Sequence, residues 1–313
     1  MGYIVITGAA GFIGSVLIKA LNKKGINQIM CFDCLGKDDK WKNLLGKDFL
    51  DIMHYDKLFQ YLNEVNNNVD VVVHLGACSS TTENDMDYLL ENNYRFSQKL
   101  YNLCFEKGIR LIWASSAATY GDGKRGFSDD NFELSPLNKY GFSKHLFDLW
   151  QDKEKNKPEQ YVGLKFFNVY GPNEYHKKGM HSAILTFYQQ AVSGGYIEIY
   201  GDGKQERDFI YVEDVADIII FFIQNGGING IFNVGSGVST KFYDIASLIF
   251  KELNMKKNII YSPLPDDLKT TYQFYTRADI NKLHDCQYTN SITMVEEGIK
   301  KYINEYLIPR CYL

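Results

Sequence analysis

Residues 3–14 read YIVITGAAGFIG and decide which fold is expected for this chain. The apolar run at the start predicts a strand, and apolar residues at helical spacing over 12–24 predict a helix. Between them, Gly8, Gly11 and Gly14 allow a sharp turn that brings the backbone and the free N–H groups of the helix start close to a pyrophosphate. The spacing is G-x-x-G-x-x-G instead of G-x-G-x-x-G. The strand-turn-helix context still favours a dinucleotide site over a turn that serves only packing.

Asp33 follows the next expected strand, over 28–32, and lies 19 residues beyond Gly14. An acidic residue at this place usually bonds the ribose hydroxyls of NAD. Lys37 and Lys40 come shortly afterwards, and a cation there can accept the 2′-phosphate of NADP instead. From these residues alone, both cofactors remain open.

The alternation of strands and helices continues through the first half of the chain. Further strands are expected over 69–75, 110–114 and 161–167, and helices over 55–66, 86–107 and 140–153. This rhythm predicts an α/β fold: a Rossmann-type doubly wound parallel sheet with a smaller α/β C-terminal substrate domain. We place the NAD(P)-binding Rossmann domain at 1–167, joined by about 205–230. Most of 168–313 is expected to form the substrate-binding domain.

Composition excludes several classes of function. The 313 residues are 45% hydrophobic and 23% charged, and a net charge of -4 gives no basic footprint for nucleic acid. The longest apolar run, 218–223, is too short to cross a bilayer, and the N-terminal strand leaves no room for a targeting segment, so we expect a cytoplasmic protein without a membrane partner. The six histidines lack metal-ligand spacing, and Cys31 and Cys34 form only a lone C-x-x-C match, so no metal site is expected.

A serine-rich run and a tyrosine-lysine pair form the candidate catalytic group. The run SSAATY, over 115–120, follows an expected strand and so lies at the carboxyl edge of a parallel sheet, where ligands bind. Tyr140 and Lys144 in PLNKYGFSK are four residues apart and share one helix face. An ammonium at Lys144 favours the phenolate of Tyr140, and Ser116 can hold a substrate oxygen, which gives a proton relay beside a hydride carrier. Taken alone, Tyr-x-x-x-Lys is a common surface pair; the glycine loop and the serine run favour function.

These three features resemble the extended short-chain dehydrogenase/reductase family, which contains nucleotide-sugar epimerases and dehydratases. Within it, the chain is most similar to the ADP-L-glycero-D-manno-heptose 6-epimerases over about residues 3–307. The segments that carry this resemblance are HLGACSSTTENDMDYLLENNY (74–94), ASSAATYG (114–121), NKYGFSK (138–144), FFNVYGPNEYHKKGM (166–180), RDFIYVEDVAD (207–217) and GIFNVGSG (230–237).

The resemblance implies epimerisation at C6 of ADP-D-glycero-D-manno-heptose through a transient 6-keto sugar, in the synthesis of the lipopolysaccharide inner core. Protons must move on both faces of C6, so a second acid/base group is needed beside Tyr140. By register this is Lys177, with its neighbour Lys178 as the alternative. A lysine can do this work if burial or a nearby cation lowers its pKa. The family also implies a homo-oligomer, such as a pentamer.

The resemblance assigns further contacts residue by residue. Lys40 matches the contact with a 2′-phosphate, which favours NADP over NAD. The cofactor contacts implied, with the glycine loop included, are Gly8, Gly11, Phe12, Ile13, Gly14, Asp33, Lys40, Leu75, Gly76, Ala77, Cys78, Ser79, Asn92, Lys144, Val169 and Lys177. The substrate contacts implied are Ser116, Asn168, Gly179, Tyr200, Gly201, Asp202, Gly203, Lys204, Arg207 and Tyr272. Gly179 stands where the family often has serine, and residues 308–313 have no counterpart in the family pattern.

Three other functions are compatible with parts of the pattern. A UDP-hexose 4-epimerase needs only the tyrosine and serine, so the Tyr-His-Lys stretch over 175–177 argues against it. A dehydratase needs an acid beside the serine run, and Ala117, Ala118 and Thr119 supply none. A dinucleotide-sensing protein without catalysis is the third, since fold alone does not fix function; retention of Tyr140 and Lys144 argues against it.

Overall fold

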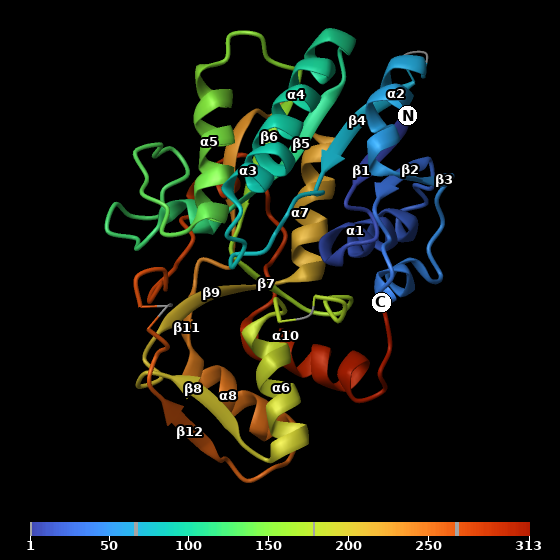
Figure 1. Ribbon diagram of the computed structural model, residues 1–313. Coiled ribbons are helices and arrows are strands. Elements are labelled where there is room, and N and C mark those ends of the chain that lie inside the picture. Colours follow the sequence, from blue (N-terminus) through green and yellow to red (C-terminus); the bar gives the residue numbers. More distant parts are fainter. Residues whose placement is uncertain (1, 66–67, 178, 267–268) are drawn as a thin grey trace.

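The computed structural model describes residues 2–65, 68–177, 179–266 and 269–313. Its main body is a seven-stranded parallel sheet in the order β10-β6-β5-β4-β1-β2-β3, above a smaller region of short sheets and helices (Figure 1). The strands of the main sheet are β1 (Tyr3–Thr7), β2 (Ile29–Asp33), β3 (Asp51–His54), β4 (Val69–His74), β5 (Arg110–Ser116), β6 (Tyr161–Phe166) and β10 (Gly230–Val234). The expected Rossmann-type doubly wound sheet is confirmed.

Helices cover both faces of this sheet, which explains its almost continuous apolar strands. One face packs on α1 and α7, and the other on α2, α4 and α5. These helices span α1 (Phe12–Lys23), α2 (Leu58–Glu64), α4 (Phe96–Lys107), α5 (Lys139–Lys153) and α7 (Val212–Gln224). The chain runs outward from β1 to β3 and then returns to β4 on the other side of β1. The strand order therefore reverses at β1, where open α/β sheets bind ligands.

The smaller region has its own apolar core. One of its sheets has three strands in the order β11-β9-β7, and the other pairs β8 with β12. The strands are β7 (Asn168–Tyr170), β8 (Ile197–Tyr200), β9 (Glu206–Tyr211), β11 (Ser239–Lys241) and β12 (Ile259–Ser262), and the helices are α6 (Ala183–Gly194), α8 (Phe242–Glu252) and α10 (Val295–Lys301). The short helix α9 (Asn281–Asp285) packs instead on β10, in the core of the main body. Because β10 and α7 belong to the main body, the chain crosses between the two regions more than once. The exact domain division stays a prediction.

The structure departs from the sequence-based elements in three places. The edge strand β3 was not expected. The helix expected over 55–66 is a short 3-10 turn, η2 (Tyr55–Lys57), followed by α2. The helix expected over 86–107 is three pieces, because a π-helical turn, η3 (Leu90–Arg95), separates α3 (Met86–Leu89) from α4.

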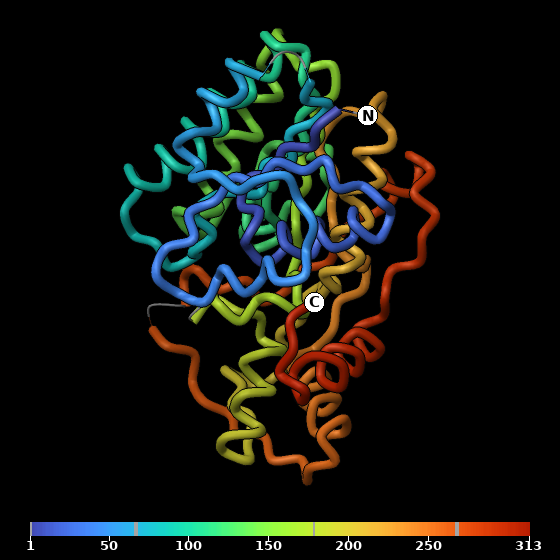
Figure 2. Tube along the Cα trace, turned by 90° about the vertical axis from the view of Figure 1, so that its right-hand side faces the viewer, coloured from blue at the N-terminus to red at the C-terminus, as the bar shows by residue number. Residues whose placement is uncertain are grey.

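Short turns complete the architecture: η1 (Asp39–Leu44), η4 (Ala117–Tyr120) and η5 (Tyr302–Leu307). After η5, the last residues rise from the smaller region towards the main body (Figures 1 and 2), where Leu313 bonds Lys47, a residue that follows η1. In the part of the chain that the structure describes, no helix has the length and apolarity needed to span a membrane. The same residues contain no cluster of three or more potential metal ligands.

Candidate active site

The glycine loop at the end of β1 is built for close approach of a ligand to the backbone. Gly8 has a φ of 67°, and a Cβ added there would lie 2.7 Å from the backbone nitrogen of Gly76. A Cβ at Gly14 would lie 2.2 Å from the carbonyl oxygen of Gly8, so α1 can pack this close only with glycine. Gly11 caps α1 without a side-chain hydrogen bond. These features fit the pyrophosphate of a dinucleotide at the start of α1.

A carboxylate and an ammonium, those of Asp33 and Lys40, lie together beside the glycine loop. Asp33 is buried at the end of β2, where its Oδ2 accepts from the Ala10 N–H (2.8 Å) and its Oδ1 from the Cys34 N–H (2.7 Å). The amine of Lys40, from η1, pairs with the same Oδ1. Asn43, also in η1, donates to the carbonyl of Ala10 (2.9 Å). The carboxylate for ribose hydroxyls and the cation for a 2′-phosphate therefore lie side by side.

The loop that follows β4 is fixed by Asn93, a residue that the sequence analysis did not select. Asn93 is buried, accepts from the Cys78 N–H (2.9 Å) and donates to the Cys78 carbonyl (3.0 Å) and to Ser143 on α5 (3.0 Å). Its neighbour Asn92 donates instead to a carbonyl one turn earlier in its own helix. Asn93 thus anchors the loop at Cys78, one of the residues 75–79 expected at the cofactor, and the cofactor contact expected of Asn92 stays a prediction.

The expected catalytic group assembles where β5 meets α5. Lys144 is buried and its amine donates to the Ala114 carbonyl (2.8 Å); burial lowers its pKa to about 8, against the raising effect of Asp148. Burial raises the pKa of the Tyr140 phenol, and a hydrogen bond with Ser116 opposes the rise. The Lys144 amine is directed to the Ala114 carbonyl, and a lowering of the Tyr140 pKa by Lys144 stays a prediction.

A buried ion pair lies behind the serine run. Asp148, one turn after Lys144 on α5, accepts from the Ser115 hydroxyl (2.7 Å) and pairs with Lys165 of β6 (3.6 Å), and both charged side chains are almost completely buried. Lys165 also donates to Thr119 (3.0 Å). The pair joins β6, α5 and the serine turn, so it fixes where Ser116 lies relative to α5. The i, i+4 spacing from Lys144 was a sequence signal for Asp148; Lys165 had none.

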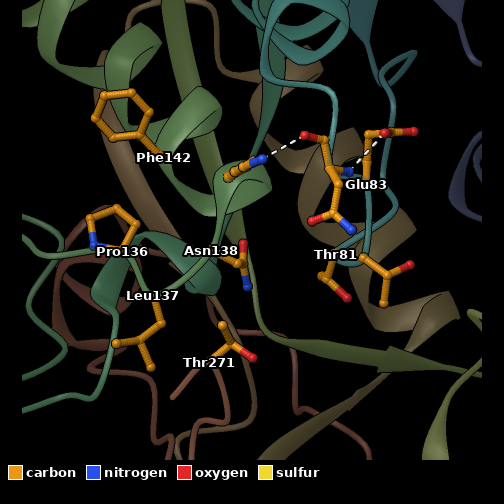
Figure 3. A pocket seen from close by; sticks show the side chains of 10 residues that line it. Thr81, Glu83, Pro136, Leu137, Asn138, Phe142 and Thr271 are labelled. Atoms are coloured by element: carbon orange, nitrogen blue, oxygen red, sulfur yellow. Dashed lines mark hydrogen bonds between the residues drawn. The ribbon is translucent and has the colours of Figure 1, made fainter. Parts of the chain in front are cut away.

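A pocket of about 520 Å³ opens beside the start of α5. Figure 3 shows Thr81 and Glu83, from the loop after β4, facing Pro136, Leu137 and Asn138, which precede Tyr140. The Lys139 amine closes one side by donating to the Asn84 carbonyl. The segment 74–94, singled out in the sequence, thus forms one wall of the space next to the candidate catalytic tyrosine.

Lys177, in the loop between β7 and α6, lies against the start of α1. Its amine lies 5.1 Å from the centre of the Phe12 ring, at the first residue of α1, and the side chain is partly buried. Burial lowers the pKa of Lys177, while the buried carboxylate of Glu174 raises it. Lys178, the alternative second acid/base group, lies outside the described residues.

The diphosphate candidate Arg207 is enclosed on β9. It is 6% exposed, stands 5.1 Å from the ring centre of Tyr272 and 5.8 Å from that of Phe242, and burial lowers its pKa to about 10. A buried guanidinium between rings is preorganised to bind an anion. Asn168 lies nearby and donates to the carbonyl of Asp208, the residue after Arg207 (3.0 Å).

Other predicted substrate residues are more open to solvent. Tyr200 is 41% exposed, and Asp202 and Lys204 form an exposed ion pair in the turn after β8. Gly179 is exposed, with a φ of 71°. The geometry brings together the glycine loop, the loop after β4, the serine run and α5, with Lys177 against Phe12. Among the other predicted residues, Gly179, Tyr200, Gly201, Asp202 and Lys204 are exposed, Asn92 is partly buried and Gly203 is buried.

Comparison with known proteins places these features in a family. The NAD dependent epimerase/dehydratase family matches residues 4–235. An ADP-L-glycero-D-manno-heptose-6-epimerase of Fusobacterium nucleatum is 43% identical, with 97% of this chain and 98% of that protein covered. One of Nitratidesulfovibrio vulgaris is 44% identical, with 97% of each covered.

Solved structures agree on the fold. A Helicobacter pylori ADP-L-glycero-D-manno-heptose-6-epimerase superposes with a TM-score of 0.83 at 27% identity, covering 97% of this chain and 96% of that one. A UDP-N-acetylglucosamine 4-epimerase of Methanobrevibacter ruminantium superposes with a TM-score of 0.87 at 26% identity, covering 99% of both. The chain belongs to the NAD dependent epimerase/dehydratase family.

Proposed function

We propose that this chain epimerises ADP-D-glycero-D-manno-heptose at C6 to the L-glycero form, with NADP as cofactor and a transient 6-keto sugar. The support is the naming of relatives at 41–44% identity over nearly the whole chain, together with the site geometry. In the cell, we place the enzyme in the cytoplasm, in the synthesis of lipopolysaccharide inner-core precursors, as a homo-oligomer.

One observation favours this reaction over epimerisation at C4: the position of Lys177. A tyrosine-serine relay is sufficient at C4, whereas Lys177 adds an amine at the start of α1, with a pKa lowered by burial. An amine with a lowered pKa can act as a proton acceptor near neutral pH. The chain therefore offers two acid/base groups on different elements, one for each face of C6.

In this proposal, each residue of the site has a separate role in the reaction. Bound nicotinamide supplies a hydride acceptor and donor next to C6. Tyr140 exchanges a proton with the C6 oxygen in one configuration and Lys177 in the other, while Ser116 donates a hydrogen bond to that oxygen. Lys144 stays fixed to the Ala114 carbonyl, where its charge favours ionised groups nearby. Arg207 binds the diphosphate, so that the sugar can turn while the nucleotide stays in place.

We infer a preference for NADP from the place of Lys40. Its amine lies against Asp33 at the ribose end, so it can reach a 2′-phosphate at the same point. The carboxylate also leaves NAD as a possible cofactor.

Incubation with ADP-D-glycero-D-manno-heptose tests the proposal, with the C6 configuration followed by NMR. We expect conversion to a mixture of both epimers, and no conversion of UDP-glucose under the same conditions. Conversion of UDP-glucose with no conversion of the heptose would replace the proposal with a UDP-hexose 4-epimerase.

A further inference from the structure

Residues 311–313 pack on the loop that carries Lys177. The carbonyl of Cys311 accepts from the Tyr175 hydroxyl (3.0 Å), and the Leu313 N–H donates to Oδ1 of Asn173 (3.0 Å). The rings of Tyr312 and Tyr175 meet edge to face, with centroids 5.1 Å apart. These three contacts all fall on residues 173–175, two to four positions before Lys177.

The same short segment also contacts the stretch of chain that follows η1. The Lys47 amine, which follows η1, bonds the Leu313 carbonyl. The Leu313 side chain packs against both apolar cores, so it bridges the main body and the smaller region. In Figure 2, the end of the chain is drawn in red where it reaches the middle of the molecule from the smaller region.

Asn173 connects residues 311–313 with α1 and the glycine loop. It is fully buried in a backbone conformation with a φ of 76°, which is uncommon for any residue other than glycine. Its side chain donates to Ser15 on α1 (3.0 Å), and its carbonyl accepts from Asn43 (3.1 Å). Asn43 in turn bonds the Ala10 carbonyl in the glycine loop. Loop 171–177 is thus held between the glycine loop and residues 311–313.

We propose that residues 311–313 act as a strap that positions Lys177 against the cofactor site. Tyr312 and Leu313 are positioning residues: they touch loop 171–177 and act on the reaction only through Lys177. The inference rests on the proposed function, because it takes Lys177 as one of the two acid/base groups. Its structural half, that the strap orders loop 171–177, can be measured without substrate.

Two variants weaken the strap to different degrees. Tyr312→Ala removes the ring contact with Tyr175, and deletion of residues 311–313 removes all three contacts. Tyr312→Phe keeps the ring and is the matched control. Tyr312 is partly exposed, so its substitution leaves both cores filled. Melting temperatures show whether each variant remains folded.

Hydrogen exchange gives the first readout. Loss of the ring contact in Tyr312→Ala is expected to speed amide exchange in 171–177 by roughly two- to tenfold. The deletion variant also loses the two hydrogen bonds, so its exchange in 171–177 should be faster by roughly tenfold or more, with α5 unchanged in both variants. Unchanged exchange in the deletion variant would overturn the strap, whatever the enzyme's activity.

The second readout separates positioning from general damage. Reduction of bound nicotinamide is followed in single turnovers, starting from each of the two C6 epimers. The strap variants are expected to lose on the order of 10- to 100-fold in rate from the one epimer that uses Lys177. The rate from the other epimer, which uses Tyr140, and all rates of Tyr312→Phe should stay near wild type.

The outcomes keep the strap and the proposed function distinct. Equal losses from both epimers, or no loss from either, would overturn the positioning role while the wild type still converts the heptose. If the wild type converts neither epimer, the proposed function fails and hydrogen exchange alone decides whether the strap orders the loop.

Discussion

The two candidate acid/base groups are presented by very different parts of the molecule. Tyr140 lies in the first turn of α5, a 15-residue helix whose start is capped by Asn138 and which packs on the sheet. Lys177 lies in a loop between β7 and α6 that is held by side-chain hydrogen bonds from distant residues. A regular helix positions Tyr140, whereas hydrogen bonds from residues distant in the sequence position the loop that carries Lys177.

The two acid/base groups differ in how many contacts hold each of them in place. On the α5 side, Lys144, Ser143 and Asp148 are all bonded to neighbouring elements, so loss of one contact leaves the helix in place. On the loop side, the position of Lys177 depends on Asn173 and on the buried carboxylate of Glu174. We therefore expect changes on the loop side to act selectively on one proton transfer.

The largest effect is expected from Tyr140→Phe. Removing the phenol takes away one acid/base group, and we expect kcat to fall by roughly 10³-fold, within the range for general acid-base catalysis. Binding of the cofactor should remain, because the glycine loop and Asp33 lie on other elements. Turnover by NMR and cofactor titration by fluorescence measure the two quantities.

A second phenol deletion provides the control for Tyr140→Phe. Tyr120, the last residue of the serine-rich run 115–120, is buried and donates to Asn233 (2.7 Å). Tyr120→Phe should cost about 1–3 kcal/mol in the free energy of unfolding because it leaves a buried acceptor unpaired, yet retain most of the turnover. Similar turnover losses in the two variants would remove the special role of Tyr140.

Lys177→Met should have the next largest effect and should be asymmetric. We expect a fall of roughly 10²-fold in the single-turnover reduction of nicotinamide from one C6 epimer, and little change from the other. Lys124→Met removes an exposed lysine that pairs with Asp122 and is the control. Full activity of Lys177→Met from both epimers would leave the loop side without a catalytic group.

Lys40→Ala should weaken binding of the cofactor and should affect the reactions from the two C6 epimers equally. Loss of a charge-assisted hydrogen bond to the 2′-phosphate is worth about 1.5–3 kcal/mol, so NADP affinity should fall roughly 10- to 100-fold while NAD affinity changes little. At saturating cofactor, the ratio of the variant rate to the wild-type rate should be the same for both epimers. The exposed Lys37→Ala is the matched control, and an equal loss for NAD and NADP would argue against a 2′-phosphate contact.

The sheet and the α5 side could be predicted from the sequence because their signals are local. Strand-helix alternation predicted the parallel sheet, and the spacing of Tyr140 and Lys144 placed both on one helix face. β3 was missed because it is a short edge strand with exposed ends, so it lacks an apolar run. The helix over 86–107 was predicted as continuous because the π-helical turn around the buried Asn93 has no sequence signal at helical spacing.

The loop side could be predicted only as far as the family resemblance reached. The resemblance selected Lys177, but nothing local indicates that Asn173 bonds a residue 158 positions earlier and another 140 positions later. Residues 308–313 had no family counterpart and were given no role. Contacts of this kind depend on the complete fold, so only the structure could show them.

Glu174→Gln should have the smallest effect, a shift in the pH dependence of kcat/KM. Burial lowers the pKa of Lys177 and the Glu174 carboxylate raises it, so removing that charge should lower the pKa further. As a base, Lys177 must be unprotonated, and the limb of the kcat/KM profile that reports it should therefore move to lower pH. The shift should be visible only for the epimer that uses Lys177. Glutamine keeps one acceptor oxygen, which can serve the N–H of Ser182 (2.5 Å). Its amide nitrogen replaces the oxygen that accepts from the Ser182 hydroxyl (2.8 Å) and the Gly171 N–H (3.3 Å), so hydrogen exchange of 171–177 serves as the control that the loop keeps its place. An unmoved limb, or the same shift for both epimers, would mean that the loop side does not control a proton transfer of its own.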